Sequence, residues 1–178
     1  MRYVYQNAEM KFKGKRIDVL TVDTELPQGG TSRREVVNHP GAVVILPLLD
    51  EKTVILIRNE RFVVQQTLWE LPAGTLEEKE DPLACAHREL IEETGYRAAK
   101  MTHLFDFFST PGFCNELLFG YLAEDLHFEG QKLDPSEKID MEAVSIETAI
   151  QMIHERVICD AKTICLLLYF VHYMQQKL

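Results

Sequence analysis

The sequence predicts an α+β fold: an α/β/α sandwich built on a mixed sheet, with an extension of antiparallel strands before it. Strand-like runs lie on both sides of one well-capped internal helix, and two helical stretches close the chain. The 178 residues, of which 46% are hydrophobic and 26% charged, are enough to build a proper core. We therefore divide the chain into an extension over residues 1–40 and a main domain over residues 41–178.

Two strands are expected in the extension. Arg16–Glu25 and Ser32–His39 carry β-branched residues and flank a turn-forming Pro-Gln-Gly-Gly run at residues 27–30. The apolar side chains of these strands are too numerous to lie free in water, so we expect a second copy of the chain to cover them in a homodimer. They are Ile17, Val19, Val22, Val36 and Val37.

The main domain is expected to open with a hairpin. Gly41–Leu49 and Thr53–Arg58 are β-branched runs bridged by residues 50–52, and the short apolar segment Trp69–Leu71 follows. Three more strands and two helices complete the predicted domain. The strands are Lys100–Phe108, Leu117–Ala123 and Ile139–Val144, and the helices are Ile146–Glu155 and Asp160–Gln176.

The internal helix has clear signals at both ends. Asp81 suits the N-cap, Pro82 the first helical position, and Gly95 the left-handed position after the last turn. At 100° per residue, one arc of this helix is apolar and is expected to face the core. That arc consists of Leu83, Ala86, Leu90 and Thr94.

Composition excludes several classes of function. A net charge of −9 argues against DNA or RNA as a partner, because a polyanion calls for a basic face. The four cysteines and six histidines are dispersed, which argues against disulfides and a zinc site. No apolar run is long enough to span a bilayer, and the first residues do not resemble a signal peptide. We therefore expect a cytoplasmic protein with no membrane or nucleic-acid partner.

Three glutamates share a second arc of the internal helix. Glu89, Glu92 and Glu93 lie within one turn, and each unpaired like-charge pair destabilises a helix by roughly 0.2–0.5 kcal/mol. Arg88 is beside them but cannot neutralise three carboxylates. Oxygen ligands without histidine or cysteine indicate Mg²⁺ or Mn²⁺. An acidic arc is also typical of a solvated surface, so the cluster alone leaves both interpretations open.

The spacing around the glutamates decides between these interpretations. The sequence follows the pattern Gly-x5-Glu-x7-Arg-Glu-U-x-Glu-Glu-x-Gly-U, in which U is a bulky apolar residue. A match at a given start has a chance on the order of one in a billion from average residue usage. The segment resembles the signature of the Nudix hydrolases. The matching residues are Gly74, Glu80, Arg88, Glu89, Leu90, Glu92, Glu93, Gly95 and Tyr96, the last being aromatic where an aliphatic residue is commoner.

This resemblance implies a Nudix-type sandwich and a metal-dependent hydrolase of nucleoside diphosphate compounds. Glu89 and Glu93 would be metal ligands together with the main-chain carbonyl of Ala73, and Glu92 a further ligand or an orienting group. Four other residues of the pattern would be structural: Glu80 and Arg88 would brace the preceding loop on the helix, and Gly74 and Gly95 would shape the chain at its two ends.

A second resemblance points to the ADP-ribose pyrophosphatase subgroup, which acts on nucleoside diphosphate sugars. It rests on Ser109–Phe113, on Arg33-Arg34-Glu35 ahead of His39–Val43, and on Asp160–Thr163. Pro111 and Gly112 would form a rigid loop that the substrate approaches closely, although an isolated turn of this kind is common.

The subgroup resemblance also implies roles for single residues. Arg34 and Glu35 would contact the nucleotide end of the substrate from the partner subunit of a dimer. Arg61 would bind the diphosphate with its planar fork, and Glu116 the distal ribose. For these residues, a surface salt bridge is the alternative interpretation.

A general base is expected in the acidic loop before the last strand. Glu137 matches the loop glutamate of related enzymes best, Asp134 is the nearest acid upstream, and Glu92 is the alternative base. The sequence does not decide which residue contacts the nucleobase. Around residues 13–16, Arg16 could stack on a base, and Phe12 is nearby.

The predicted function is therefore the Mg²⁺- or Mn²⁺-dependent hydrolysis of ADP-ribose to AMP and ribose 5-phosphate. One alternative is a pyrophosphatase for another nucleoside diphosphate sugar, such as GDP-mannose. A module that binds a nucleotide without turnover is a second alternative, but such modules usually lack a glutamate of the pattern, and this chain has all three.

Overall fold

The computed structural model describes residues 5–133 and 138–175, with side chains to residue 173. The strands in these ranges are β1 (Glu9–Lys13), β2 (Asp18–Glu25), β3 (Thr31–Asn38), β4 (Ala42–Asp50), β5 (Thr53–Arg61), β6 (Gln66–Glu70), β7 (Ala73–Thr75), β8 (Tyr96–Phe108), β9 (Leu117–Phe128) and β10 (Ile139–Ser145). The helices are α1 (Pro82–Thr94), α2 (Ile146–His154) and α3 (Ala161–Gln175). The predicted α+β fold is confirmed, and the segment that contains Glu137 lies outside the described residues.

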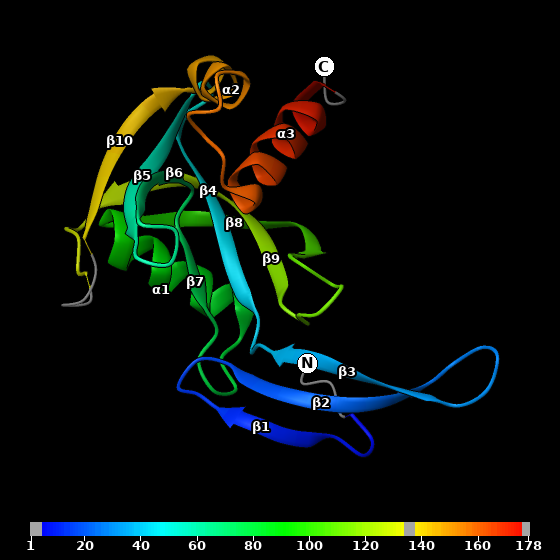
Figure 1. Cartoon of the computed structure of the whole chain (residues 1–178). Coiled ribbons are helices and arrows are strands. Elements are labelled where there is room, and N and C mark those ends of the chain that lie inside the picture. Colours follow the sequence, from blue (N-terminus) through cyan, green and yellow to red (C-terminus); the bar gives the residue numbers. More distant parts are fainter. Residues whose placement is uncertain (1–4, 134–137, 176–178) are drawn as a thin grey trace.

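The main sheet has the order β10-β5-β4-β9-β8, with β6 added to β5 and β7 to β4. β4 pairs parallel to β9, while the other pairs are antiparallel, so the sheet is mixed as predicted. In Figure 1, α1 lies on one side of this sheet and α2 and α3 on the other.

The central strand β4 explains why its sequence is apolar without alternation. Val44 and Leu46 face a core with α2 and α3, whereas Val43 and Ile45 face a second core with α1. A strand covered on both faces has no solvent side, and the positions from Ala42 to Leu48 are therefore all apolar and buried.

The N-terminal strands form a separate sheet, β1-β2-β3, which lies below the main domain in Figure 1. It joins the domain where Val37 of β3 bonds to the β8–β9 loop: its amide donates to the Phe113 carbonyl at 2.7 Å, and its carbonyl accepts from the Asn115 amide at 3.2 Å. Strand β1 was not predicted. All five of its side chains are exposed, so no burial pattern marks it in the sequence.

Helix α1 has the predicted ends but a different packed face. The Asp81 carboxylate accepts from the amides of Leu83 and Ala84, and Gly95 has φ 74° with its amide bonded to the Ile91 carbonyl. Leu83 was predicted to face the core and is 42% exposed, which makes that prediction wrong. The buried arc is rotated toward Cys85 and the glutamates because α1 also packs its acidic side against β7.

The short strand β7 was not predicted either, and the remaining differences concern the lengths of elements. β8 starts at Tyr96 and β9 continues to Phe128, several residues beyond the predicted bounds, because the two strands pair with each other over this length. No helix among the described residues is long and apolar enough to cross a membrane.

Candidate active site

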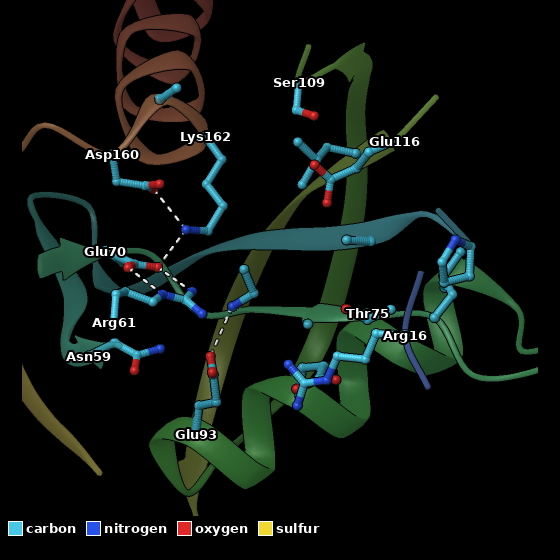
Figure 2. Close-up of a pocket in the computed structure, with 18 of the residues that line it drawn as sticks. Arg16, Asn59, Arg61, Glu70, Thr75, Glu93, Ser109, Glu116, Asp160 and Lys162 are labelled. Atoms are coloured by element: carbon cyan, nitrogen blue, oxygen red, sulfur yellow. Dashed lines mark hydrogen bonds and ion pairs between the residues drawn. The ribbon is translucent and has the colours of Figure 1, made fainter. Parts of the chain in front are cut away.

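A pocket of about 1190 Å³ lies over the acidic side of α1. Its walls come from distant parts of the chain: the β1–β2 turn, β5 and β6, β7, the ends of β8 and β9, and the start of α3. Figure 2 shows side chains from these elements pointing into the same space. The pocket is the meeting point of most residues that the sequence singled out.

Strand β7 packs its backbone directly on two glutamates of α1. Glu89 and Glu93 line the pocket yet are only 8% and 3% exposed. The Ala73 amide donates to Glu93 Oε2 at 2.9 Å. A Cβ on Gly74 would lie 1.8 Å from the Glu89 carboxyl carbon, so only glycine allows this approach. These acids therefore belong to a constructed site and not to a solvated surface.

Arg88 contacts three of the surrounding carboxylates. It donates to Glu80 at 2.8 and 2.9 Å, to Glu89 at 2.6 Å and to Glu92 at 3.0 Å. The hydrogen bond from Arg88 lowers the pKa of Glu80 to about 2, and Glu80 in turn raises the pKa of Arg88. Glu80 also accepts from the Glu77 amide at 2.9 Å, which ties the loop before α1 to the helix. Arg88 thus offsets more of the acidic repulsion than we expected from the sequence.

The chemistry of this face fits a hard divalent cation. Glu89, Glu92, Glu93 and Ala73 line one pocket and offer only oxygen ligands. Among the described residues, no three acidic, histidine or cysteine side chains already converge as a metal cluster. The ligand set is therefore suitable in kind, while its carboxylates are held by Arg88 and the Ala73 amide.

A second charged group was not predicted from the sequence. Glu70 is 1% exposed and accepts a bidentate pair from Arg61, at 2.8 Å to Oε1 and 2.6 Å to Oε2. Lys162 also donates to Glu70 and lies 2.9 Å from Asp160. Burial raises the pKa of Glu70, but Arg61 and Lys162 outweigh it and hold the pKa below its ordinary value. Only Arg61 was predicted as a site residue.

This charged group is anchored to the backbone through the first turn of α3. Asp160 accepts from the amide and hydroxyl of Thr163, at 3.0 and 2.6 Å, and the same hydroxyl accepts from the Leu71 amide at 2.8 Å. An aspartate directly before a helix is a capping signal in the sequence. No local pattern, however, indicates that this turn meets β6.

Glu116 lies in the pocket with a histidine behind it. His39 Nε2 is 3.6 Å from Glu116 Oε1, and His39 Nδ1 accepts from the Gly41 amide at 3.1 Å. That bond leaves the proton of a neutral ring on Nε2, toward Glu116. Burial lowers the pKa of His39 although Glu116 opposes this, so the neutral ring is favoured.

Four predicted substrate residues do not line this pocket. Arg34 and Glu35 are exposed on β3, and Pro111 and Gly112 are exposed in the β8–β9 loop. Gly112 does not have a positive φ, and a Cβ on it would meet no atom within 4 Å. Gly112 thus needs no left-handed backbone here, and the approach of a substrate to this loop stays a prediction. The neighbouring Ser109 is a pocket residue instead.

The chain's own N-terminal turn does reach the pocket. Lys15 and Arg16 line it, and Figure 2 shows the Arg16 side chain reaching into this space from the β1–β2 turn. Phe12 is exposed and is not a lining residue. Glu137 and Asp134, the two acids considered for the loop base, lie outside the described residues, whereas Leu133 lines the pocket.

Comparison with known families agrees with this geometry. The NUDIX domain family matches residues 38–167, which include the whole acidic helix. The chain belongs to the Nudix family. Over 171 residues it is 42% identical to an ADP-ribose pyrophosphatase of Bacillus subtilis (strain 168), covering 95% of this chain and 90% of that one. The protein is therefore a Nudix hydrolase, a pyrophosphohydrolase similar to ADP-ribose pyrophosphatase.

Other Nudix relatives carry different descriptions. A methanol dehydrogenase activator of Bacillus methanolicus is 37% identical over 163 residues, covering 90% of this chain and 88% of the relative. A GDP-mannose pyrophosphatase of Klebsiella pneumoniae is more distant, at 32% over 149 residues, covering 77% and 74%. The crystal structure of an ADP compounds hydrolase superposes with a TM-score of 0.82 over 98% of both chains at 21% identity, which establishes the shared fold.

Proposed function

We propose that this Nudix pyrophosphohydrolase cleaves ADP-ribose to AMP and ribose 5-phosphate. One observation carries the proposal: the buried glutamates of α1 and the guanidinium of Arg61 face one pocket. A diphosphate needs both kinds of group, because its oxygens bind divalent cations and arginine forks. The 42% identity to an ADP-ribose pyrophosphatase supports the choice of substrate.

The metal face would consist of Glu89, Glu93, the Ala73 carbonyl and Glu92, with Mg²⁺ or Mn²⁺ as the ion. A cation bound there would neutralise the diphosphate and lower the pKa of a coordinated water. Gly74 and the Ala73 amide fix two of the carboxylates before substrate arrives. This preorganisation supports a catalytic site because little reorganisation is then needed during the reaction.

In the proposed reaction, a water oxygen attacks one phosphorus, and the bond from that phosphorus to the bridging oxygen breaks. Glu137 accepts the proton of the attacking water, and Glu92 is the alternative base. Arg61 balances charge on the departing phosphate.

The outer contacts of the substrate complete the proposal. Glu116 would bind the distal ribose, oriented by His39. Arg34 and Glu35 would act at the pocket of a partner subunit in a homodimer, since both are exposed on β3 and do not line their own pocket. Pro111 and Gly112 would form a rigid loop that the substrate approaches.

A substrate panel tests the activity. The purified protein would be incubated with Mg²⁺ and ADP-ribose, ADP-glucose, GDP-mannose, UDP-glucose, NADH or diadenosine polyphosphates, and products would be separated by chromatography. We expect AMP to appear fastest from ADP-ribose. If GMP were released faster from GDP-mannose, GDP-mannose would replace ADP-ribose as the proposed substrate. That result would support the activity named for the more distant relatives. No turnover together with tight nucleotide binding would overturn the enzyme assignment.

Paired variants test the metal face. Glu93→Gln should abolish turnover, because Glu93 is buried against β7 and faces the pocket. Glu147→Gln is the matched control, since it neutralises an exposed glutamate in the first turn of α2. Equal activity of both variants would contradict the proposed metal site.

The general base has a test of its own. Glu137→Gln should lower kcat and flatten its acidic pH limb, whereas Glu92→Gln should keep that limb if Glu92 only binds metal. The reverse result would assign the base to Glu92.

The partner contribution can be tested by mixing two inactive variants. If Arg34 acts in trans, co-expressed Arg34→Ala and Glu93→Gln chains should regain about a quarter of the wild-type activity. Half of the dimers are then mixed, and each mixed dimer has one complete site. No recovery, or a monomer in light scattering, would exclude the dimeric arrangement.

A further inference from the structure

The pocket face of β5 carries a neutral polar residue beyond the apolar part of the strand. Residues 54–57 are buried and apolar, and after them Arg58 and Glu60 are exposed while Asn59 is only 8% exposed. Because side chains alternate along a strand, Asn59 points to the same face as Arg61, and both line the pocket. The backbone of Asn59 pairs with β6 on one side and with β10 on the other, so the residue is held inside the sheet.

The side-chain amide of Asn59 forms no hydrogen bond within the described parts of the chain. A carboxamide has two N–H donors and an acceptor oxygen, and leaving it unpaired inside a folded protein costs stability. Among the described residues, only the Thr21 hydroxyl is both unpaired and shut off from water, so the amide atoms of Asn59 open onto the pocket. A buried and unpaired amide at the wall of a pocket indicates a group that binds a ligand.

Asn59 lies where the cationic and the acidic parts of the pocket meet. Figure 2 shows it beside Arg61, at the side of the pocket where Glu93 of α1 also lies. Helix α1 packs against β5, and Glu93 is near enough to Arg61 to contribute to the raised pKa of that guanidinium. The amide is therefore a neutral group at the place where the proposed reaction brings the diphosphate and the acidic helix together.

The chemistry of an amide suits a water molecule better than a phosphate oxygen. A phosphate oxygen only accepts hydrogen bonds, and the neighbouring Arg61 is a stronger, charged donor for it. The amide oxygen of Asn59 can instead accept a proton of a water molecule, which no cation can do. Because no bond fixes which amide atom points inward, this oxygen is free to turn toward the ligand.

We infer that Asn59 orients the attacking water of the proposed hydrolysis by accepting a hydrogen bond from it. With one proton on the amide oxygen and the other on the general base, the water directs a lone pair at phosphorus. The water oxygen then forms its bond to phosphorus, the bond from phosphorus to the bridging oxygen breaks, and the second proton passes to the base. The inference rests on the proposed function in that it assumes hydrolysis of a diphosphate.

Steady-state kinetics with Mg²⁺ test the role of the amide. Asn59→Leu removes the amide and keeps a side chain of similar size. Its kcat for ADP-ribose should fall about 100-fold, the loss that a misplaced reacting group causes, while KM should change less than twofold. Gln151→Leu is the matched control, because it removes an exposed amide of α2 outside the pocket and should leave both constants unchanged. If Asn59→Leu fails to fold, Asn59→Ala carries the kinetic test without added bulk.

The stability of the same variant separates a catalytic role from a structural one. Leucine replaces an unpaired amide with apolar contact, so the Tm of Asn59→Leu should rise by roughly 2–4 °C. Asn115→Leu gives the contrast, because the Asn115 amide accepts from the His39 amide at 2.7 Å and donates to Asn38 at 2.8 Å, so its Tm should fall. A lower Tm together with a lower kcat in Asn59→Leu would show that the fold needs this amide and would overturn the inference.

Binding without turnover decides between water and substrate as the ligand of Asn59. Titration calorimetry in EDTA should give the same affinity for ADP-ribose in Asn59→Leu and in the wild type, because the amide acts on the water. A tenfold loss of affinity would assign the amide to the substrate instead and would overturn the inference.

The outcomes distinguish this inference from the proposed function. A folded Asn59→Leu protein with the kcat of the wild type would overturn the role of Asn59 even if ADP-ribose proved to be the substrate. If another nucleoside diphosphate compound proved to be the substrate, the same loss of kcat on that compound would still support the role. A wild type without any turnover would overturn the proposed function and this inference together.

Discussion

Replacing Gly74 with alanine should inactivate the enzyme through Glu89, which lies in α1, the next element along the chain. The new Cβ would lie 1.8 Å from the Glu89 carboxyl carbon and 1.9 and 2.3 Å from its oxygens. To reach the 3.4 Å of an ordinary contact, the carboxylate or the β7 backbone must move by about 1.6 Å. A displacement of about 1 Å at a catalytic group can cost roughly 100-fold in rate, so kcat should fall by about that factor or more.

The same clash should lower stability. Overpacking of a buried contact costs about 1–3 kcal/mol, which corresponds to a Tm lower by roughly 2–12 °C for a chain of this size. Calorimetry and an ADP-ribose hydrolysis assay would measure the two effects on the same preparation.

A double variant isolates the cause. Glu89→Ala removes the atoms that the new Cβ would meet, so Gly74→Ala combined with Glu89→Ala should be no less active than Glu89→Ala alone. Its Tm should also exceed the value expected from adding the two single effects. Wild-type kcat and Tm in Gly74→Ala, or strictly additive losses in the double variant, would refute the argument that Gly74 exists to admit Glu89.

Three further effects follow from the caps and pairs of α1. Asp81→Ala should cost about 1 kcal/mol in urea unfolding, because two amides lose their acceptor; an unchanged midpoint would contradict the N-cap assignment. Gly95→Ala should cost at least about 1 kcal/mol in the same assay, since φ is 74° and the new Cβ would lie 2.6 Å from the Gln131 amide nitrogen; full stability would show that the turn adapts. The pKa of Glu80 is lowered to about 2 from 4.5, so its ion pair with Arg88 stabilises the fold above pH 4.5 and is lost as pH falls toward 2. Glu80→Gln should remove this part of the dependence of stability on pH. A pH profile of Tm identical to that of the wild type would exclude a contribution from the Glu80–Arg88 ion pair.

The fold was predictable where the signal is local in the sequence. It was less predictable where an element's structure depends on the other elements that pack or pair with it. Asp81 and Gly95 fix the ends of α1 through their own backbone contacts, and both were predicted. Leu83 was misplaced because the helix wheel reports apolar positions but not that α1 would also bury charged ones. β1 was missed because all five of its residues are exposed, so its pairing with β2 leaves no burial pattern in the sequence.

The residues of the site were likewise predictable where they lie close together in the sequence and not where they lie far apart. The glutamates of α1 and Gly74 lie within 20 residues of each other, and their spacing carried the family resemblance. Glu70 and Lys162 are 92 residues apart, and nothing local in the sequence indicates that they meet. The resemblance placed Arg34 and Glu35 at the substrate, but the single chain leaves them on the surface of β3. Such a contribution depends on a second chain, which one sequence cannot position.

The hydrogen bond from the Leu71 amide to the Thr163 hydroxyl has a consequence for biosynthesis. The segment just before β7 is anchored by a residue made 92 positions later. During translation from the N-terminus, the whole acidic helix therefore leaves the ribosome before its neighbouring loop can be fixed. Contacts so far apart form late, because the intervening chain must first be closed into a loop. A nascent or truncated chain that ends before α3 would carry every residue of the family signature and still be inactive.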